Sequence, residues 1–156
     1  MKSIAYDSRS YEDTLALGAR FARALKGGDI VCLFGDLGAG KTAFTKGIAM
    51  GLKINPHEVH SPTFVLMSIY EGKLPVYHFD LYRISAGDLL DIGYEEFFYG
   101  KGIAVIEWSE RLGELMPKDH WHVKLAHKGG DRRRITLSFK GLGLKERFAK
   151  AVKSHS

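Results

Sequence analysis

The chain has 156 residues, of which 45% are hydrophobic and 26% are charged, and its formal net charge is +5. No apolar run is long enough to cross a bilayer, and the single cysteine, Cys32, excludes a disulfide framework. The length predicts one domain. Because the first residues lack the apolar core of a signal peptide, we expect a cytoplasmic protein that does not contact a membrane.

The positive charge is concentrated near the C-terminus. Residues 128–156 carry nine Lys/Arg and two Asp/Glu, whereas residues 1–127 carry fourteen and sixteen. Clustered positive charge favours contact with RNA or with an acidic partner. The same pattern is also typical of a solvated face on a hairpin and a last helix, and both interpretations stay open for the basic region at about 121–156.

The first half of the chain predicts alternating helices and strands. Ser10 is a suitable N-cap, acidic Glu12 and Asp13 follow it, and apolar residues recur at helical spacing, so a helix is expected from Ser10 to about Gly27. The next predicted elements are a buried strand at 29–34, a helix at 41–52, and a hairpin of 61–70 with 76–80.

The second half continues in the same way. Its predicted elements are two short helices within 85–99, a buried strand at 103–106, a helix through Leu115, a hairpin of 121–127 with 134–139, and a helix from about Leu144. The hairpins require antiparallel pairs, whereas the strand before residue 35 favours parallel neighbours. The predicted fold class is therefore α/β, a single three-layer domain of the P-loop NTPase type with a mixed sheet.

Residues 35–42 match the phosphate-binding template G-x-x-x-x-G-K-[ST], between a predicted strand and a predicted helix. In such a loop the backbone amides surround the phosphates, the lysine reaches the β- and γ-phosphates, and the hydroxyl binds Mg²⁺. The predicted ligands are ATP or ADP with Mg²⁺, and the absence of N-K-x-D favours adenine over guanine. The candidate contacts are Gly35, Asp36, Leu37, Gly38, Ala39, Gly40, Lys41 and Thr42.

Two acidic residues follow predicted strands. Asp80 ends the strand at 76–79, and Glu107 ends the strand at 103–106. If both strands run parallel to the one ending at Phe34, the two carboxylates lie at the sheet edge where ligands bind. Hydrolysis needs a carboxylate for the metal and a group that orients water, so we assign Glu107 to the metal or the water and Asp80 to the metal through water. Each is also explained as an ordinary strand-end acid.

Three further features are candidates for the same site. Thr63 follows Pro62, which restrains the backbone and would hold Thr63 toward the metal, although a strand-entry threonine explains it equally. Trp108 is expected either to stack on a base or to pack in the core. Arg83 and the arginines at 132–134 are candidates for an arginine finger, but none is convincing. We therefore expect slow hydrolysis that a partner stimulates.

Four segments together resemble one family. GDLGAGKT at 35–42, SPTF at 61–64, HFDLYR at 78–83 and IEW at 106–108 resemble, in order, the TsaE family of small bacterial ATPases, formerly called YjeE. The resemblance implies a weak ATPase required for threonylcarbamoylation of adenosine 37 in tRNAs that read codons starting with A. It implies TsaB and TsaD as partners, and both direct and complex-mediated contact with tRNA are compatible with it, as is any oligomeric state.

The resemblance also implies roles for individual residues. Lys41 and Thr42 would contact phosphates and Mg²⁺, and Glu107 would join the metal site. Asp80 and Thr63 would support that site, and Trp108 would be a functional neighbour. The Ser10 to Thr14 segment matches the family's N-terminal pattern loosely and places Thr14 near the adenine.

Two other functions are consistent with a phosphate loop. A small-molecule phosphotransferase is the first, because many short proteins with this loop are kinases. Such kinases usually need a lid with several arginines, and residues 85–99 are acidic and contain none. A nucleotide-dependent binding module that scarcely hydrolyses is the second.

Overall fold

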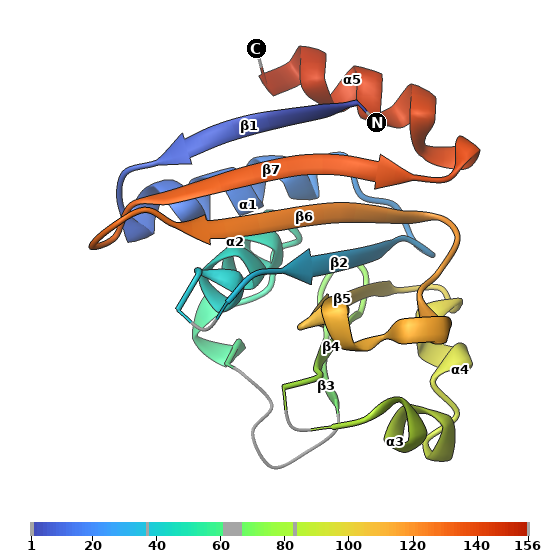
Figure 1. Cartoon of the computed structure of the whole chain (residues 1–156). Coiled ribbons are helices and arrows are strands. Elements are labelled where there is room, and N and C mark those ends of the chain that lie inside the picture. The colour runs from blue at the N-terminus through green and yellow to red at the C-terminus, as the bar shows by residue number, and fades with distance from the viewer. Residues whose placement is uncertain (1, 37, 61–66, 83, 156) are drawn as a thin grey trace.

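The computed structural model describes residues 2–36, 38–60, 67–82 and 84–155, the last four by their backbone only. Within these residues, seven strands form one sheet in the order β1-β7-β6-β2-β5-β4-β3 (Figure 1). The strands are β1 Ser3–Ser8, β2 Ile30–Phe34, β3 Met67–Tyr70, β4 Val76–Asp80, β5 Ile103–Glu107, β6 His120–His127 and β7 Arg133–Lys140.

The sheet is mixed, as the sequence predicts. Strand β2 lies between β5 and β6 and is parallel to both, and β4 is parallel to β5. The pairs β6–β7, β1–β7 and β3–β4 are antiparallel. The carboxyl ends of β2, β4 and β5 therefore meet at one edge of the sheet, which is where α/β proteins bind ligands.

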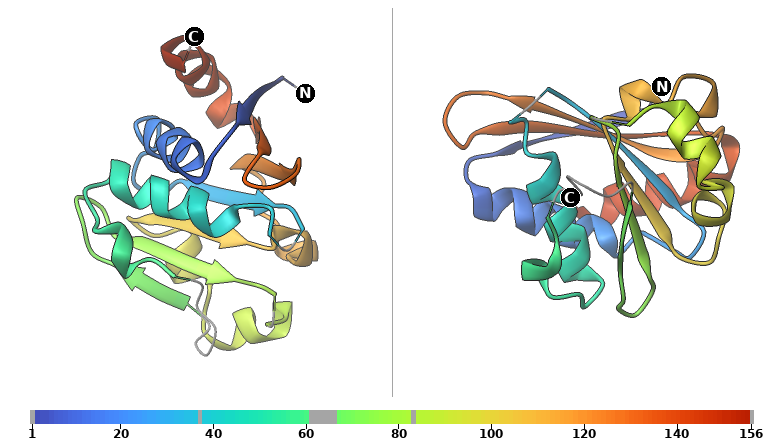
Figure 2. Two further views of the ribbon diagram at one scale, coloured as in Figure 1. Left: turned by 90° about the vertical axis from the view of Figure 1, so that its left-hand side faces the viewer. Right: turned by 90° about the horizontal axis from the view of Figure 1, so that it is seen from below.

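Helices cover both faces of the sheet. The α-helices are α1 Tyr11–Ala22, α2 Lys41–Gly51, α3 Ala86–Asp91, α4 Glu95–Phe98 and α5 Lys145–His155; the 3₁₀ turns are η1 Pro56–Glu58, η2 Ser109–Arg111, η3 Gly113–Leu115 and η4 Leu142–Leu144. Figure 2 shows α1, α2 and α5 on one side of the sheet, whereas α3 and α4 pack on the other. The fold is thus a three-layer α/β arrangement.

Strand β2 is buried on both faces, which explains why its sequence is continuously apolar. Val31 and Leu33 belong to the core under α1 and α2, whereas Ile30 and Cys32 belong to the core on the other face. Burial raises the pKa of the Cys32 thiol to about 12, so this cysteine is uncharged and unreactive at neutral pH.

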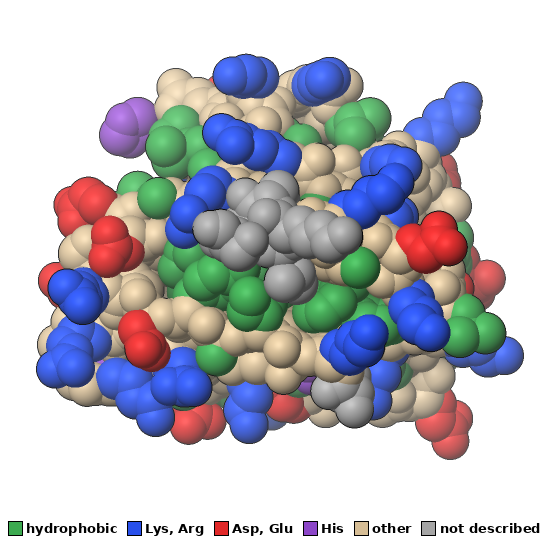
Figure 3. All heavy atoms as spheres, turned by 90° about the horizontal axis from the view of Figure 1, so that it is seen from above, with side chains coloured by type: hydrophobic (Ala, Val, Ile, Leu, Met, Phe, Trp, Pro, Cys, Tyr) green, Lys and Arg blue, Asp and Glu red, His purple; other side chains and the backbone are tan. Residues whose placement is uncertain are grey.

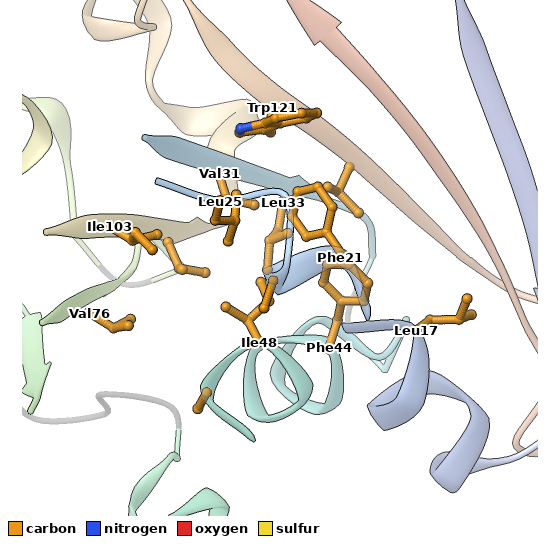
Figure 4. Packing of buried hydrophobic residues seen from close by; sticks show 14 of the residues in the cluster. Leu17, Phe21, Leu25, Val31, Leu33, Phe44, Ile48, Val76, Ile103 and Trp121 are labelled. Carbon is orange, nitrogen blue, oxygen red and sulfur yellow. The ribbon is translucent and has the colours of Figure 1, made fainter. Parts of the chain in front are cut away.

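The larger core is built around three aromatic rings. The Phe21 ring meets the Trp121 ring edge-on at 5.4 Å between centroids and lies 5.7 Å from the Phe44 ring (Figure 4). These rings come from α1, β6 and α2, so they join the first two helices to the sheet. This packing fixes α2, and with it the loop from which α2 begins.

Three elements differ from the sequence prediction. Helix α1 ends at Ala22 rather than near Gly27, because Ala24 and Leu25 donate to carbonyls three residues back, as in a tighter turn. Strand β1 was not predicted. The predicted helix through Leu115 is wrong: Gly113 adopts φ +56°, and the segment forms only η2 and η3. The predicted strand at 61–70 is seen from Met67, and 61–66 lie outside the described residues.

The basic C-terminal region is partly tied to the core. Arg147 forms an ion pair with Asp29 and donates to the Ala24 carbonyl at 2.7 Å, so its charge is compensated. Other Lys and Arg side chains are dispersed over the face seen from above (Figure 3). Within the described part of the chain, no helix is long and apolar enough to cross a membrane.

The close contact between α1 and α2 depends on glycine. A Cβ on Gly47 would lie 2.3 Å from the Leu15 carbonyl oxygen, and one on Gly18 would lie 2.5 Å from the Phe44 carbonyl oxygen. We expect Gly47→Ala to destabilise the protein by about 1–3 kcal/mol because the two helices must separate. Urea unfolding followed by circular dichroism measures this.

Gly87→Ala in α3 is the matched control, since its Cβ would meet only Ser85 Oγ at 3.5 Å. Its stability should stay within about 0.5 kcal/mol of wild type. Equal stability of Gly47→Ala and Gly87→Ala would contradict the close packing of α1 on α2.

Candidate functional site

The turn between β2 and α2 is shaped by its glycines. Gly40 directly precedes α2 with φ +98°, a conformation that side chains with a Cβ rarely adopt. Gly35 approaches β6 so closely that a Cβ would lie 2.5 Å from the Leu125 carbonyl oxygen. Ala39 N donates to Asp36 O at 3.0 Å and closes the turn. Gly38 belongs to the same turn, whereas Leu37 lies outside the described residues.

Lys41, the first residue of α2, is almost completely buried, with 5% of its surface exposed. Its Nζ donates to the carbonyl oxygens of Gly35 and Asp36, the latter at 3.1 Å. It also lies 3.8 Å from the centroid of the Trp108 ring. The ammonium group therefore lies inside the turn whose backbone would bind phosphate.

Burial lowers the pKa of Lys41. The carboxylates of four residues raise this pKa because they favour the charged form of the amine. They belong to Glu110, Glu107, Asp80 and Asp36. One buried cation thus faces several acids, so a phosphate would bind here more favourably together with a metal cation than alone.

The two predicted strand-end acids do lie side by side. Asp80 and Glu107 are register partners in the parallel pair β4–β5. Glu107 is only 2% exposed, and its Oε1 accepts a hydrogen bond from Thr42 Oγ1 at 3.2 Å. Residues 42 and 107, predicted as metal ligands from separate motifs, are therefore in direct contact.

Asp80 is less buried than Glu107. Its Oδ1 accepts a hydrogen bond from the Tyr82 amide at 3.0 Å, which orients the carboxylate at the end of β4. Burial raises the pKa of Asp80, and the neighbouring Glu107 carboxylate adds to this effect. Asp80 is thus a partly exposed carboxylate beside Glu107 at the end of β4.

Two residues behind Glu107 were not predicted from the sequence. His78 Nε2 contacts Glu107 Oε2, and His78 Nδ1 lies 3.0 Å from the Tyr70 hydroxyl. His78 has no exposed surface. A usable signal was present: His78 lies two residues before Asp80 in a buried strand, so it shares a strand face with an acid at the site.

Trp108 lies at the site and also contributes to the core. It adopts φ +59°, an unusual conformation for a residue other than glycine, and this turns the chain sharply after β5. Its half-buried ring packs against the core on the face of the sheet that α3 and α4 cover. The ring also faces Lys41 Nζ, and its centroid lies 5.1 Å from that of the Tyr82 ring. The core interpretation describes part of its surroundings, and stacking on a base stays a prediction.

Among the candidate arginines, Arg133 lies against the loop. A Cβ on Gly40 would be 3.4 Å from Arg133 Nε, and Arg133 Nη1 donates to the carbonyls of Gly130 and Arg132 at 2.7 and 2.9 Å. Its Nε is buried without a hydrogen-bond partner among the residues that the structure describes. Arg134 is exposed, and its Nη1 lies 3.6 Å from Asp7 Oδ1. Arg83 lies outside the described residues.

Two candidate contacts are not tested by this geometry. Thr14 is buried in the first turns of α1, where its Oγ1 lies 2.7 Å from Ser8 Oγ. Its proximity to an adenine stays a prediction. Thr63 lies outside the described residues, so its role also stays a prediction.

The residues present fit Mg²⁺. Thr42 supplies a hydroxyl oxygen, Glu107 a carboxylate, and Asp80 a second carboxylate nearby, all of them oxygen donors that Mg²⁺ prefers. Within the described ranges, no three His, Cys, Asp or Glu side chains are grouped to hold a metal by themselves. Mg²⁺ commonly binds through one or two protein groups and the phosphates of its substrate, which matches this arrangement.

A cavity of about 540 Å³ adjoins the loop, and its lining includes Gly35, Asp36, Glu110 and Lys124. The lining does not include Lys41, Thr42, Asp80 or Glu107. The cavity thus lies beside the group of catalytic candidates, along β6.

Comparison with known proteins identifies the same family as the motifs. The sequence profile described as threonylcarbamoyl adenosine biosynthesis protein TsaE matches residues 8–135. A protein from Treponema pallidum, named tRNA threonylcarbamoyladenosine biosynthesis protein TsaE, is 44% identical over 132 residues, covering 84% of this chain and 97% of its own length. The protein of the same name from Bacillus subtilis is 39% identical over 142 residues, covering 90% and 89%.

A solved structure agrees with these relatives. The crystal structure of YdiB from Bacillus subtilis superimposes with a TM-score of 0.82 at 31% identity, covering 99% of this chain and 97% of YdiB. The profile match extends over residues 8–135, a range that includes the turn at 35–42 and both strand-end acids. The chain belongs to the TsaE family of tRNA threonylcarbamoyladenosine biosynthesis proteins.

Proposed function

We propose that this protein is a Mg²⁺-dependent ATPase that hydrolyses ATP slowly alone and cycles with TsaB and TsaD during threonylcarbamoylation of adenosine 37. The contact between Thr42 and Glu107 carries the proposal, because it joins the phosphate loop to a buried carboxylate at the end of a parallel strand. The names of the relatives supply the pathway. The substrate tRNAs would be those that read codons starting with A.

Different residues of the chain would bind the phosphates and the metal. Loop amides and Lys41 would bind the β- and γ-phosphates, and Lys41 would exchange its carbonyl partners for phosphate oxygens. Thr42 and Glu107 would hold Mg²⁺, with Asp80 supporting it through water. When bound, Mg²⁺ offsets phosphate charge and polarises the γ-phosphate. Glu107 would also orient a water for attack.

The charge balance supports dependence on the metal. Lys41 lies among four carboxylates, so a triphosphate without a cation would meet more negative than positive charge. Arg133 is the arginine that the structure places against the loop, but its Nη1 is engaged by two backbone carbonyls. A rate-enhancing charge supplied by a partner is therefore consistent with this site.

Phosphate release by the purified protein tests the proposed function. We expect slow release from ATP that requires Mg²⁺ and increases when purified TsaB and TsaD are added together, because an arginine supplied in trans contributes about 10³–10⁵ in rate. The same reactions are screened with small-molecule acceptors. Transfer of phosphate to a metabolite would reject the ATPase in favour of a phosphotransferase, and binding without any release would favour a binding module.

Two substitutions separate binding from turnover. Lys41→Ala should weaken ATP binding about ten- to a hundredfold, since it removes a charged hydrogen-bond donor. Glu107→Gln should leave binding nearly unchanged and lower turnover about a hundredfold, since it removes a group that acts on the water or the metal. Calorimetry and phosphate release measure the two quantities.

Lys46→Ala, the same change farther along α2, is the control and should behave like wild type. Full turnover in both Lys41→Ala and Glu107→Gln would show that the site is assigned incorrectly.

Two adjacent arginines test the position of the nucleotide. Arg133→Ala should weaken ATP binding about tenfold or more, because its guanidinium lies against the loop at Gly40. Arg134→Ala is matched to it, since Arg134 is exposed and close to Asp7. Calorimetry with ATP and Mg²⁺ compares the two variants, and equal affinities would exclude Arg133 from the nucleotide site.

A further inference from the structure

A line of four side chains runs through the sheet from β3 to α2. The Tyr70 hydroxyl lies 3.0 Å from His78 Nδ1, His78 Nε2 contacts Glu107 Oε2, and Glu107 Oε1 accepts from Thr42 Oγ1 at 3.2 Å. Tyr70, His78 and Glu107 are 5%, 0% and 2% exposed. Bulk water is therefore kept from the first three members, and each polar contact in the line must be made by the protein.

The hydrogen-bond directions at Glu107 are fixed by its carboxylate, which can only accept. The Tyr70 hydroxyl donates its one proton to the carbonyl oxygen of His60 at 3.1 Å. The same hydroxyl lies 3.0 Å from His78 Nδ1 and holds the ring, so that His78 Nε2 donates to Glu107 Oε2. This orients the imidazole and leaves Nε2 directed at Glu107.

The two oxygens of the Glu107 carboxylate consequently have different partners. Oε2 faces the imidazole, and Oε1 faces the hydroxyl of Thr42. A carboxylate without the imidazole contact would be free to rotate, and its buried Oε2 would lack a partner. Groups that orient a metal ligand in this way commonly affect metal affinity as strongly as ligands do.

We propose that His78 and Tyr70 are positioning residues for the metal site: they hold Glu107 with Oε1 directed to Thr42 and thereby set the affinity for Mg²⁺ in the nucleotide complex. This inference rests on the proposed function, since it assumes that Glu107 and Thr42 hold Mg²⁺ beside a nucleotide. His78 and Tyr70 do not themselves touch the loop in the contacts described. Their influence passes through Glu107.

The test is a Mg²⁺ titration of ADP binding, followed by calorimetry, beside the Mg²⁺ dependence of phosphate release. His78→Leu should raise the Mg²⁺ concentration for half-maximal binding about 10- to 100-fold. Tyr70→Phe, which removes only the hydroxyl, should raise it about three- to tenfold. Affinity for ADP without Mg²⁺ should stay at the wild-type value in both variants.

Two further variants distinguish positioning from a structural role. His78→Gln retains an amide that can donate toward Glu107, so it should recover part of the Mg²⁺ affinity lost in His78→Leu. Tyr77→Phe is the matched control for Tyr70→Phe, because the Tyr77 ring packs on Phe97 on the other face of β4. It should titrate like wild type.

The outcomes separate this inference from the proposed function. If wild type binds Mg²⁺ and ADP but the folded His78→Gln and Tyr70→Phe variants need no more Mg²⁺ than wild type, the positioning role is rejected and the proposed function stands. If wild type binds no nucleotide, both are rejected. Should His78→Leu fail to fold, the other two variants still decide.

Discussion

A buried lysine charge is the interaction on which the rest of the site depends. An ammonium group that is 5% exposed is costly unless hydrogen-bond acceptors and opposite charges surround it. Lys41 has both, since two loop carbonyls accept from it and acids from β4, β5 and η2 lie around it. One ammonium group thereby interacts with the loop, with the ends of β4 and β5, and with the turn after β5, and these groups form one electrostatic unit.

The order of the strands makes this unit geometrically feasible. Because β2, β5 and β4 are adjacent and parallel, the loop after β2 and the acids at the ends of β5 and β4 share one edge of the sheet. Trp108 then turns the chain back in a left-handed conformation and covers Lys41. Negative charge exceeds positive charge in this unit, and a magnesium ion bound with the nucleotide would offset part of that excess.

Local patterns predicted much of this arrangement. The strand, the loop and α2 are contiguous, and Asp80 and Glu107 each end a short apolar run, so parallel pairing was enough to bring them together. What the sequence could not show depends on distant partners. Strand β1 forms through pairing with β7, more than a hundred residues away, and Arg133 reaches Gly40 only across the β6–β7 hairpin. His78 shares a strand face with Asp80, but its partners Tyr70 and Glu107 come from neighbouring strands whose order the sequence did not give.

The central claim is that this edge of the sheet binds a nucleotide together with Mg²⁺. Calorimetric titration of the folded wild-type protein with ADP, with and without Mg²⁺, measures it most directly. The account predicts heat of binding at one site per chain and tighter binding when the metal is present. No heat in either titration, from protein whose circular dichroism shows it to be folded, would contradict it.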